Sequence, residues 1–451
     1  MKQRLFLQID NAPLIIFRIF FGFLLACETF GAILTGWVKS NFVETQFTFS
    51  HIGLEWLQPL PGYGMYIYFI AMGILGLLVM AGYKYRWTLG AYTLMWAGVY
   101  FMQKTSYNNH YYLLLLVCLI MLFLPAANYA SLDAKQNPVQ KKLTMPVWCS
   151  WIMIVQISIV YFYATLAKFY PGWLNGTFVH HLLNHSVTNP ELNKVMTQEW
   201  FYLFITYAGM VFDLLVVPLM LFKRTRTIAF VASIIFHIFN SITLQIGIFP
   251  FFALSFAVFF YPPDAIRKLF FKKKPFSEDA GIPTTEGKNI LYYFFVPYLI
   301  VQLALPLRHY FIEGDVLLTE EGHRLSWRMM LRTRSGFTNF KVVDKKTGDI
   351  LFYDVATELT QKQLHGMETK PDMIWQMAQR IKKHFNQSGK DVAVYADTKV
   401  SINNGPYEIL IDPKADLAAA KWNYFSHCEW IILPQNKDIL KKQIHSAFYH
   451  N

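Results

Sequence analysis

The chain has 451 residues, of which 54% are hydrophobic, 17% aromatic and 16% charged, and its mean hydropathy is +0.27. This composition excludes a wholly soluble protein and indicates an integral membrane protein with soluble parts. The net charge of +12 does not indicate nucleic-acid binding, because the basic residues are spread over several loops and form no single stripe with interleaved aromatic residues.

Apolar runs of the length that spans a bilayer, about twenty residues or somewhat fewer, recur as far as residue 306. Nine segments qualify: 12–34, 63–82, 87–103, 111–127, 147–167, 201–222, 227–246, 248–262 and 290–306. The eighth is short, and the sequence does not define its boundary with the seventh. Arg18 interrupts the first run and no small-residue cleavage site follows it, so we expect this helix to remain in the mature protein.

Lysine and arginine accumulate in alternate loops between these segments. If the N-terminus is cytoplasmic, the inner loops hold most of the basic residues, including the run from Arg267 to Lys274. The outer loops then hold only Lys39, Lys104, Lys168 and Lys194. Because short cytoplasmic loops are enriched in Lys and Arg, we expect this orientation, with everything after Leu307 outside the cytoplasm. A re-entrant eighth segment would reverse the parity, so we expect it to cross.

Residues 307–451 are more polar and carry turn signals. Two strands are predicted within 339–355, around Lys346-Thr347-Gly348, and two more within 392–413, around Asn403-Asn404-Gly405. Between the two hairpins, 371–385 places apolar residues on one helical face. These residues are Ile374, Met377, Ile381 and Phe385.

The predicted fold is therefore a polytopic α-helical membrane domain of about nine transmembrane helices, residues 1–306, followed by a small α+β extracytoplasmic domain, residues 307–451. The stretch 272–288, rich in Pro, Gly and Thr, is the predicted linker.

Lys168 stands at the end of the fifth apolar run, just before a Pro-Gly break. A lysine there can extend its ammonium into the lipid headgroups, which is a purely structural role. The alternative is a general base, because a desolvated lysine can lose its proton and accept another. The second interpretation requires further polar groups nearby.

Such groups are predicted on the same side of the membrane. The loop 104–110 ends in Asn109-His110, His237 and Asn240 share a face of the seventh helix, and Arg308-His309 follows the ninth. Each group alone has a structural explanation, as a helix cap or as hydrogen-bonded packing. Together on one side they favour a site. Three other intramembrane charges are assigned to structural pairing: Arg18, Glu28 and Asp213.

Seven motifs resemble, in order and over nearly the whole chain, the vitamin K-dependent gamma-glutamyl carboxylase family of membrane proteins with an HTTM domain. They are KTSYNNHYYL (104–113), AKFYPGWLNG (167–176), FHIFNSITLQIGIFPF (236–251), LPLRHY (305–310), GHRLSWRMMLRTRS (322–335), TGDILFYDV (347–355) and KVSINNGPYEILIDPKADL (399–417).

The resemblance implies a carboxylase and epoxidase that takes a reduced vitamin K-type naphthoquinol, O2 and CO2 and acts on peptidyl glutamate, with no metal. Lys168 matches the family's base, and His110 with Asn109 matches its active-site Asn-His pair. We expect His237, Asn240, His309 and Trp327 to bind the quinol. Arg328 and Arg334 are expected to bind the glutamate carboxylate, with Arg334 the first choice because it matches a family arginine.

The outer domain is then expected to bind the substrate protein, and the setting implied for a bacterial-type homologue is the inner membrane. Departures from the family pattern concern mainly the protein substrate: 403–407 differs in detail, and Leu183-Asn184 stands where the family has an arginine.

Three other functions fit parts of the sequence. One is quinol epoxidation without carboxylation. Another is a metal oxygenase, since the His180, His181 and His185 pattern is similar to an iron-binding histidine box, although no second box occurs. The third is a non-enzymatic membrane module whose outer domain binds a peptide or lipid.

Overall fold

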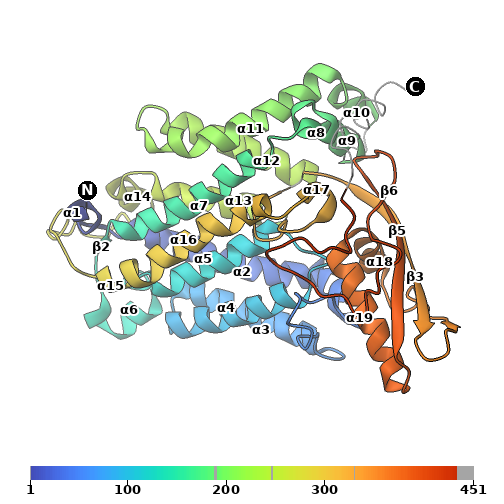
Figure 1. Ribbon diagram of the computed structural model, residues 1–451. Helices are drawn as coiled ribbons and strands as arrows, with labels where there is room; N and C mark the ends of the chain where they lie inside the picture. Colours follow the sequence, from blue (N-terminus) through green and yellow to red (C-terminus); the bar gives the residue numbers. More distant parts are fainter. Residues whose placement is uncertain (1, 187–189, 245–246, 330, 434–451) are drawn as a thin grey trace.

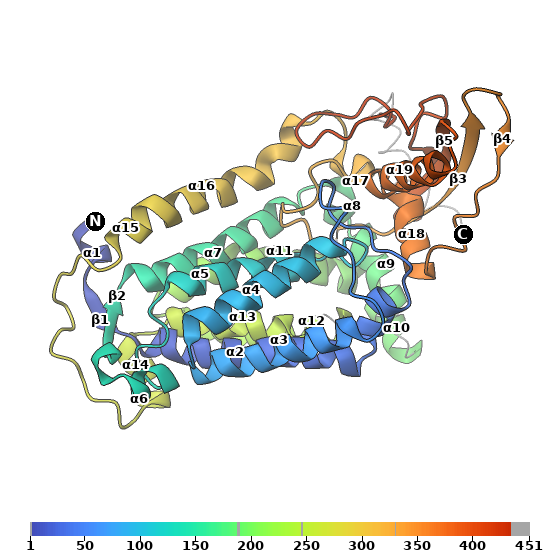
Figure 2. The ribbon, with the colours of Figure 1, turned by 90° about the horizontal axis from the view of Figure 1, so that it is seen from below.

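The computed structural model describes residues 2–186, 190–244, 247–329 and 331–433. Figure 1 shows an elongated bundle of helices with the N-terminus at one end and a smaller mixed domain at the other, and Figure 2 shows the same division after rotation. The two ends predicted to lie on opposite sides of a membrane are therefore at opposite ends of the bundle.

Long apolar helices make up most of this bundle. They are α2 (Ala12–Leu34), α3 (Gly64–Ala81), α7 (Trp148–Leu166), α11 (Glu199–Leu221), α12 (Arg226–Leu244) and the helix that runs through α15 (Lys288–Ile290), η4 (Leu291–Phe295), α16 (Val296–Ala304) and η5 (Leu305–Phe311). In the described part of the chain, six helices are long and apolar enough to cross a membrane, or seven if one bent pair counts as a span. An integral membrane architecture is confirmed, and six to seven of the nine predicted crossings are supported.

Two predicted crossings appear as helices in the middle of the bundle. The third is α4 (Tyr85–Met102), whose aromatic and polar residues lower its hydropathy, and it buries Tyr92 and Trp96. The fourth is α5 (Asn109–Phe123), which is apolar but has only 15 residues and is mostly buried. A helix surrounded by other helices needs neither full spanning length nor a lipid-facing surface.

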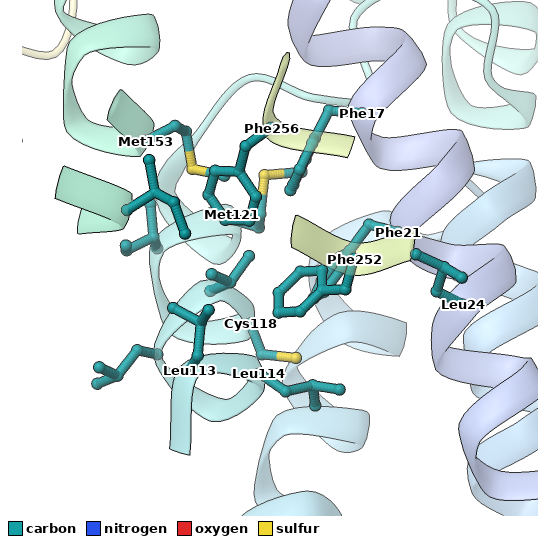
Figure 3. Close-up of a cluster of buried hydrophobic side chains, with 14 of the residues drawn as sticks. Phe17, Phe21, Leu24, Leu113, Leu114, Cys118, Met121, Met153, Phe252 and Phe256 are labelled. Atoms are coloured by element: carbon teal, nitrogen blue, oxygen red, sulfur yellow. The ribbon is translucent and has the colours of Figure 1, made fainter. Parts of the chain in front are cut away.

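The eighth predicted segment is a broken helix. Residues 248–262 hold α13 (Phe249–Ser255) and η3 (Phe256–Phe259), and α14 (Pro263–Phe270) follows them after a bend of 118°. The break coincides with Pro262-Pro263, because proline cannot continue the helical hydrogen bonds. Figure 3 shows Phe252 and Phe256 inserted among Phe17, Phe21 and Met121 in the bundle core. The segment runs from the end near the mixed domain to the N-terminal end, where α14 packs on α2 and β1.

The N-terminal end of the bundle is closed by short elements. These are α1 (Lys2–Leu5), β1 (Gln8–Asp10), α6 (Leu132–Gln136), η2 (Pro138–Gln140) and β2 (Thr144–Pro146), with β1 antiparallel to β2. Lys274, predicted in the basic run of a cytoplasmic loop, is fully buried in an ion pair with Asp10 and donates to the Leu143 carbonyl. The predicted linker 272–288 is thus fixed to this end of the bundle.

The mixed domain at the other end, here called the outer domain, contains a four-stranded sheet in the order β4-β3-β5-β6. Its elements are α17 (Val316–Thr319), β3 (Arg334–Asp344), β4 (Ile350–Leu351), α18 (Gln361–Thr369), α19 (Pro371–Gln387), β5 (Val392–Ile402) and β6 (Glu408–Ile409). Both predicted hairpins are confirmed. The apolar face of α19 is also confirmed, since Ile374, Met377 and Ile381 are buried against the sheet.

Four short elements lie close to the outer domain. They are η1 (Lys39–Val43), α8 (Pro171–Leu174), α9 (Thr177–Ser186) and α10 (Pro190–Met196).

Gly22 sets the close approach of α2 and α3. A Cβ atom at Gly22 would come within 2.3 Å of the Met80 backbone nitrogen, whereas a Cβ at Gly31, on the same helix, meets nothing within 4 Å. We expect Gly22→Ala to lower the free energy of unfolding by about 1–3 kcal/mol, because rigid backbone must move. Thermal unfolding in detergent, with Gly31→Ala as the matched control, checks this. Equal midpoints for the two variants would contradict it.

Candidate active site

Lys168 lies two residues beyond the end of α7, where its backbone N–H still bonds to the Thr165 carbonyl at 3.0 Å. Its side chain turns into the protein and is only 10% exposed. The ammonium forms an ion pair with Asp213 of α11 and lies 5.1 Å from the centre of the Trp173 ring. Lys168 therefore does not extend toward lipid headgroups, and Asp213 does not pair with Arg18 or Glu28 as the sequence suggested.

His110 and His237 belong to a second group. The His110 ring stacks on Phe249 with centroids 3.7 Å apart, and His237 meets the same Phe249 ring edge-on at 6.0 Å. His237 Nε2 is 3.0 Å from the Tyr161 hydroxyl, so the two histidines predicted from distant segments share one cluster. Asn240 lies one turn further along α12 and is partly buried.

Asn109 belongs to a third group, at the junction with the outer domain. Its side chain accepts a hydrogen bond from the Tyr107 hydroxyl and donates to the Arg328 carbonyl, each at 3.1 Å. Arg328 in turn lies 3.3 Å from His309 Nε2, while His309 Nδ1 lies 2.8 Å from the Pro306 carbonyl. The oxygen and the nitrogen of the Asn109 amide each form one hydrogen bond, and together they join α5 to the outer segment.

Trp327 is completely buried beside Tyr112, with ring centroids 4.9 Å apart. Leu325 and Trp327 adopt positive φ angles of 62° and 57°, which are unusual for side chains of this size. The Leu325 N–H donates to the Tyr107 hydroxyl at 2.7 Å, which helps to hold this turn. Such backbone conformations persist where surrounding structure fixes them, often at functional sites.

Sequence adjacency links the three groups. Asn109 and His110 are neighbours, and Phe212, next to Asp213, packs on both Tyr161 and His237. Lys168 and His110 are not within hydrogen-bonding distance of each other. The predicted residues therefore gather at one end of the bundle, but as adjoining groups and not as one cluster.

Three buried ring nitrogens in these groups have no hydrogen-bond partner among the described residues: Trp173 Nε1, His237 Nδ1 and Trp327 Nε1. Buried polar atoms are nearly always paired, so unpaired ones indicate places where a ligand or water binds. An apolar cavity next to His237 and Tyr161 has a volume of about 20 Å³, which holds about one water molecule.

A larger cavity, of about 290 Å³, lies between the segment 320–334 and residues 365–370, at the end of α18. We call it the basic cavity. Its charged and titratable lining residues are Glu320, His323, Arg324, Arg328, Arg332, Arg334, His365 and Lys370. Burial, reinforced for Arg332 by Arg334, lowers the pKa of the Arg332 guanidinium to about 9, and burial does the same for Arg334. The excess of cations suits an anionic ligand.

Arg334 has little capacity left for such a ligand. Its guanidinium donates to the carbonyls of Thr369, Leu317 and Leu318 at 2.6 to 3.0 Å and lies 3.4 Å from Glu320. Arg328 differs, since its buried Nε has no partner among the described residues. Of the two predicted carboxylate-binding arginines, Arg328 has the freer donors.

The outer domain is held on the bundle by a buried ionic contact. Asp372, near the start of α19, accepts hydrogen bonds from Lys104 at 2.6 Å and from Arg324 at 2.8 Å. Burial alone would raise the pKa of the Asp372 carboxyl, but Arg324 and Lys104 outweigh it and keep the pKa well below its usual range. Lys104, expected in a polar loop, is thus part of the domain junction.

The histidines that resemble an iron-binding box do not belong to the three groups described above. His180 and His181 lie on α9, where their rings contact each other at 5.7 Å and His180 packs on Tyr202. Within residues 2–186, 190–244, 247–329 and 331–433, no group of three or more His, Cys, Asp or Glu residues could hold a metal ion.

Sequence reasoning missed Asp213 as the partner of Lys168, and it also missed Tyr161 and Lys370. For Asp213 a signal existed, because a carboxylate within an apolar helix needs a cation nearby. Lys370 carries no local pattern that marks it.

Two family models match the chain. Residues 6–264 match the model of the HTTM domain, and residues 287–438 match the model of the lumenal domain of vitamin K-dependent gamma-carboxylase. The two matches follow one another in the order seen in the structure, bundle first and outer domain second. No solved structure matches the chain.

Proposed function

Because this chain belongs to the vitamin K-dependent gamma-carboxylase family, we propose that it couples oxygenation of a reduced naphthoquinol to its epoxide with γ-carboxylation of peptidyl glutamate. O2 and CO2 are the co-substrates. The N-terminus is cytoplasmic and the outer domain extracytoplasmic, in a bacterial inner membrane, so that the quinol enters from the lipid and the glutamate comes from a protein outside.

The observation that carries this proposal is the buried pair of Lys168 and Asp213. An ammonium and a carboxylate removed from water can share one proton, and when the proton lies on Asp213 the amine is neutral. A neutral amine can accept a proton from a substrate hydroxyl. Lys168 Nζ is therefore the proposed base, and Asp213 holds and orients it.

The residues present fit a quinol, because His237 Nδ1, Trp173 Nε1 and Trp327 Nε1 are buried without a hydrogen-bond partner among the described residues. His237, Asn240, His309 and Trp327 would hold it, and the unpaired indole N–H of Trp173, beside Lys168, adds a donor for a hydroxyl oxygen. Bound there, a reduced naphthoquinol with O2 supplies a base strong enough for the γ-carbon of glutamate, which no side chain can deprotonate. His110, packed on Phe249 in the same region, is the proposed group that assists carboxylation, and Asn109 positions it.

The basic cavity is the proposed place for the glutamate carboxylate. Arg328 is the first candidate to bind it, because among the described residues its Nε has no hydrogen-bond partner and its Nη1 is paired only with His309. Arg334, the first choice from sequence, lines the same cavity and supports its wall through backbone carbonyls. The outer domain covers the end of the bundle and would limit access of water to the reacting groups.

Arg328→Lys tests this assignment, because lysine keeps the charge but loses the two-pronged geometry. We expect the KM for a glutamate peptide to rise at least about tenfold, with the KM for the quinol unchanged. Arg380→Lys is the matched control, since Arg380 is a partly exposed outer-domain arginine paired with Glu358. An unchanged peptide KM in Arg328→Lys would remove Arg328 from the substrate site.

The full reaction is tested on detergent-solubilised protein supplied with reduced vitamin K or menaquinol, air, labelled bicarbonate and a glutamate peptide. Epoxide and carboxylated peptide, both measured by mass spectrometry, are the expected products. Epoxide without carboxylated peptide, across several peptides, would favour an epoxidase alone. If folded protein yields neither product with either quinol, the enzymatic proposal fails and the non-enzymatic module takes its place.

A further inference from the structure

Lys370 connects α18 to α19, and its side chain lines the basic cavity. Within the described part of the chain, its amine has no hydrogen bond and no ion pair. Two other partly or fully buried lysines of this region are engaged: Lys104 with Asp372, and Lys362 with Asn41 and Ser106. Lys370 thus presents an unpaired amine to an open space of about 290 Å³.

The neighbours of this amine favour an anion at its position. Arg324, Arg328 and Arg332 line the same cavity, and the buried Nε atoms of Arg328 and Arg332 lack partners among the described residues. The nearby carboxylates are already neutralised, Glu320 by Arg332 and Asp372 by Lys104 and Arg324. The cavity therefore holds surplus positive charge and unused donors.

The same surroundings make the amine nucleophilic. Burial, together with the charges of Arg324, Arg334 and Arg332, lowers the pKa of Lys370 to about 7, although Asp372 acts in the opposite direction. A large fraction of the amine is then neutral at neutral pH, whereas an ordinary lysine is almost entirely protonated. Neutral primary amines add reversibly to CO2.

We propose that Lys370 captures CO2 as a carbamate, whose anion is held by the surrounding arginines. In this step a bond forms between Nζ and the CO2 carbon, one C=O electron pair moves to oxygen, and Nζ releases one proton to water. Nothing is oxidised or reduced. The modification itself is independent of the proposed reaction. A role as a local store of CO2 for carboxylation rests on the proposed function.

The experiment uses full-length protein in detergent, equilibrated with ¹³CO2 and bicarbonate and trapped with a trialkyloxonium salt that esterifies carbamates. Digestion and tandem mass spectrometry then locate the label. We expect label on Lys370, none in that peptide from Lys370→Arg, and none on Lys104 in the same digest, because Lys104 is ion-paired. Lys104, which is more deeply buried than Lys370 and is held by Asp372, is thus an internal control.

The pH dependence gives an independent check. At a fixed partial pressure of CO2, the neutral fraction of an amine with a pKa of about 7 rises about tenfold between pH 6 and pH 8. Carbamate formation also releases a proton. The fraction of Lys370 that carries the label should therefore rise by at least the same factor, provided that labelling is below saturation. Absence of label on Lys370 in folded protein at high CO2, or equal label on Lys104, would overturn the proposal. Label without any carboxylation would support the carbamate while the proposed function failed.

Discussion

Replacing Lys168 with alanine is expected to lower the rate of quinone epoxide formation by at least about 100-fold, the usual contribution of a positioned general base. The loss follows from the position of Nζ, which is buried against Asp213 and beside the Trp173 ring. Epoxide is measured by mass spectrometry under air with saturating reduced quinol.

A second variant separates this chemistry from folding. Lys168→Arg keeps a cation for Asp213, so the protein should unfold at nearly the same temperature, but a guanidinium does not give up its proton and cannot serve as a base. We expect it to be as inactive as Lys168→Ala. Lys194→Ala, which removes an exposed lysine of α10 paired with Glu191, should remain fully active. Epoxide formation by Lys168→Arg within threefold of wild type would exclude a base at this position.

Local patterns carried most of the fold prediction. Apolar length marked six to seven of the spans, and turn residues with alternating strands marked both hairpins, because these signals are contained within about twenty residues. The helical face of Ile374, Met377 and Ile381 was predicted for the same reason. Hydropathy could not predict that α5 is a short internal helix, or that Pro262-Pro263 turns the chain by 118°, because both depend on what packs alongside.

The candidate site shows the same limit more sharply. Intramembrane charge and polarity pointed to one end of the bundle as the candidate site, but the sequence could not choose partners, since Lys168 and Asp213 meet only through the packing of α7 against α11. The basic run that contains Lys274 was assigned to a cytoplasmic loop from charge alone, which could not show that Lys274 is buried with Asp10. Arg334 looked available for a ligand until backbone carbonyls from two distant segments were seen to occupy its donors.

The Lys168–Asp213 pair leads to the second large effect, on stability as well as activity. Asp213→Leu leaves the Lys168 amine buried without its counter-charge, and breaking a buried pair in this way costs about 3–5 kcal/mol. Replacing both members with apolar residues of similar size is often neutral. We therefore expect the Asp213→Leu variant to unfold at a clearly lower temperature than the wild type. The double variant, Lys168→Met with Asp213→Leu, should recover most of the wild-type midpoint of thermal unfolding.

Activity should not follow stability in this series. Both the single and the double variant are expected to form no epoxide, because one lacks the group that holds the lysine and the other lacks the lysine itself. Breaking the exposed Glu191–Lys194 pair should change the free energy of unfolding by no more than about 1 kcal/mol. Recovery of both stability and epoxide formation in the double variant would mean that the pair only holds α7 to α11. Recovery of stability alone would separate a structural contribution, which apolar packing can replace, from a proton-accepting one, which it cannot.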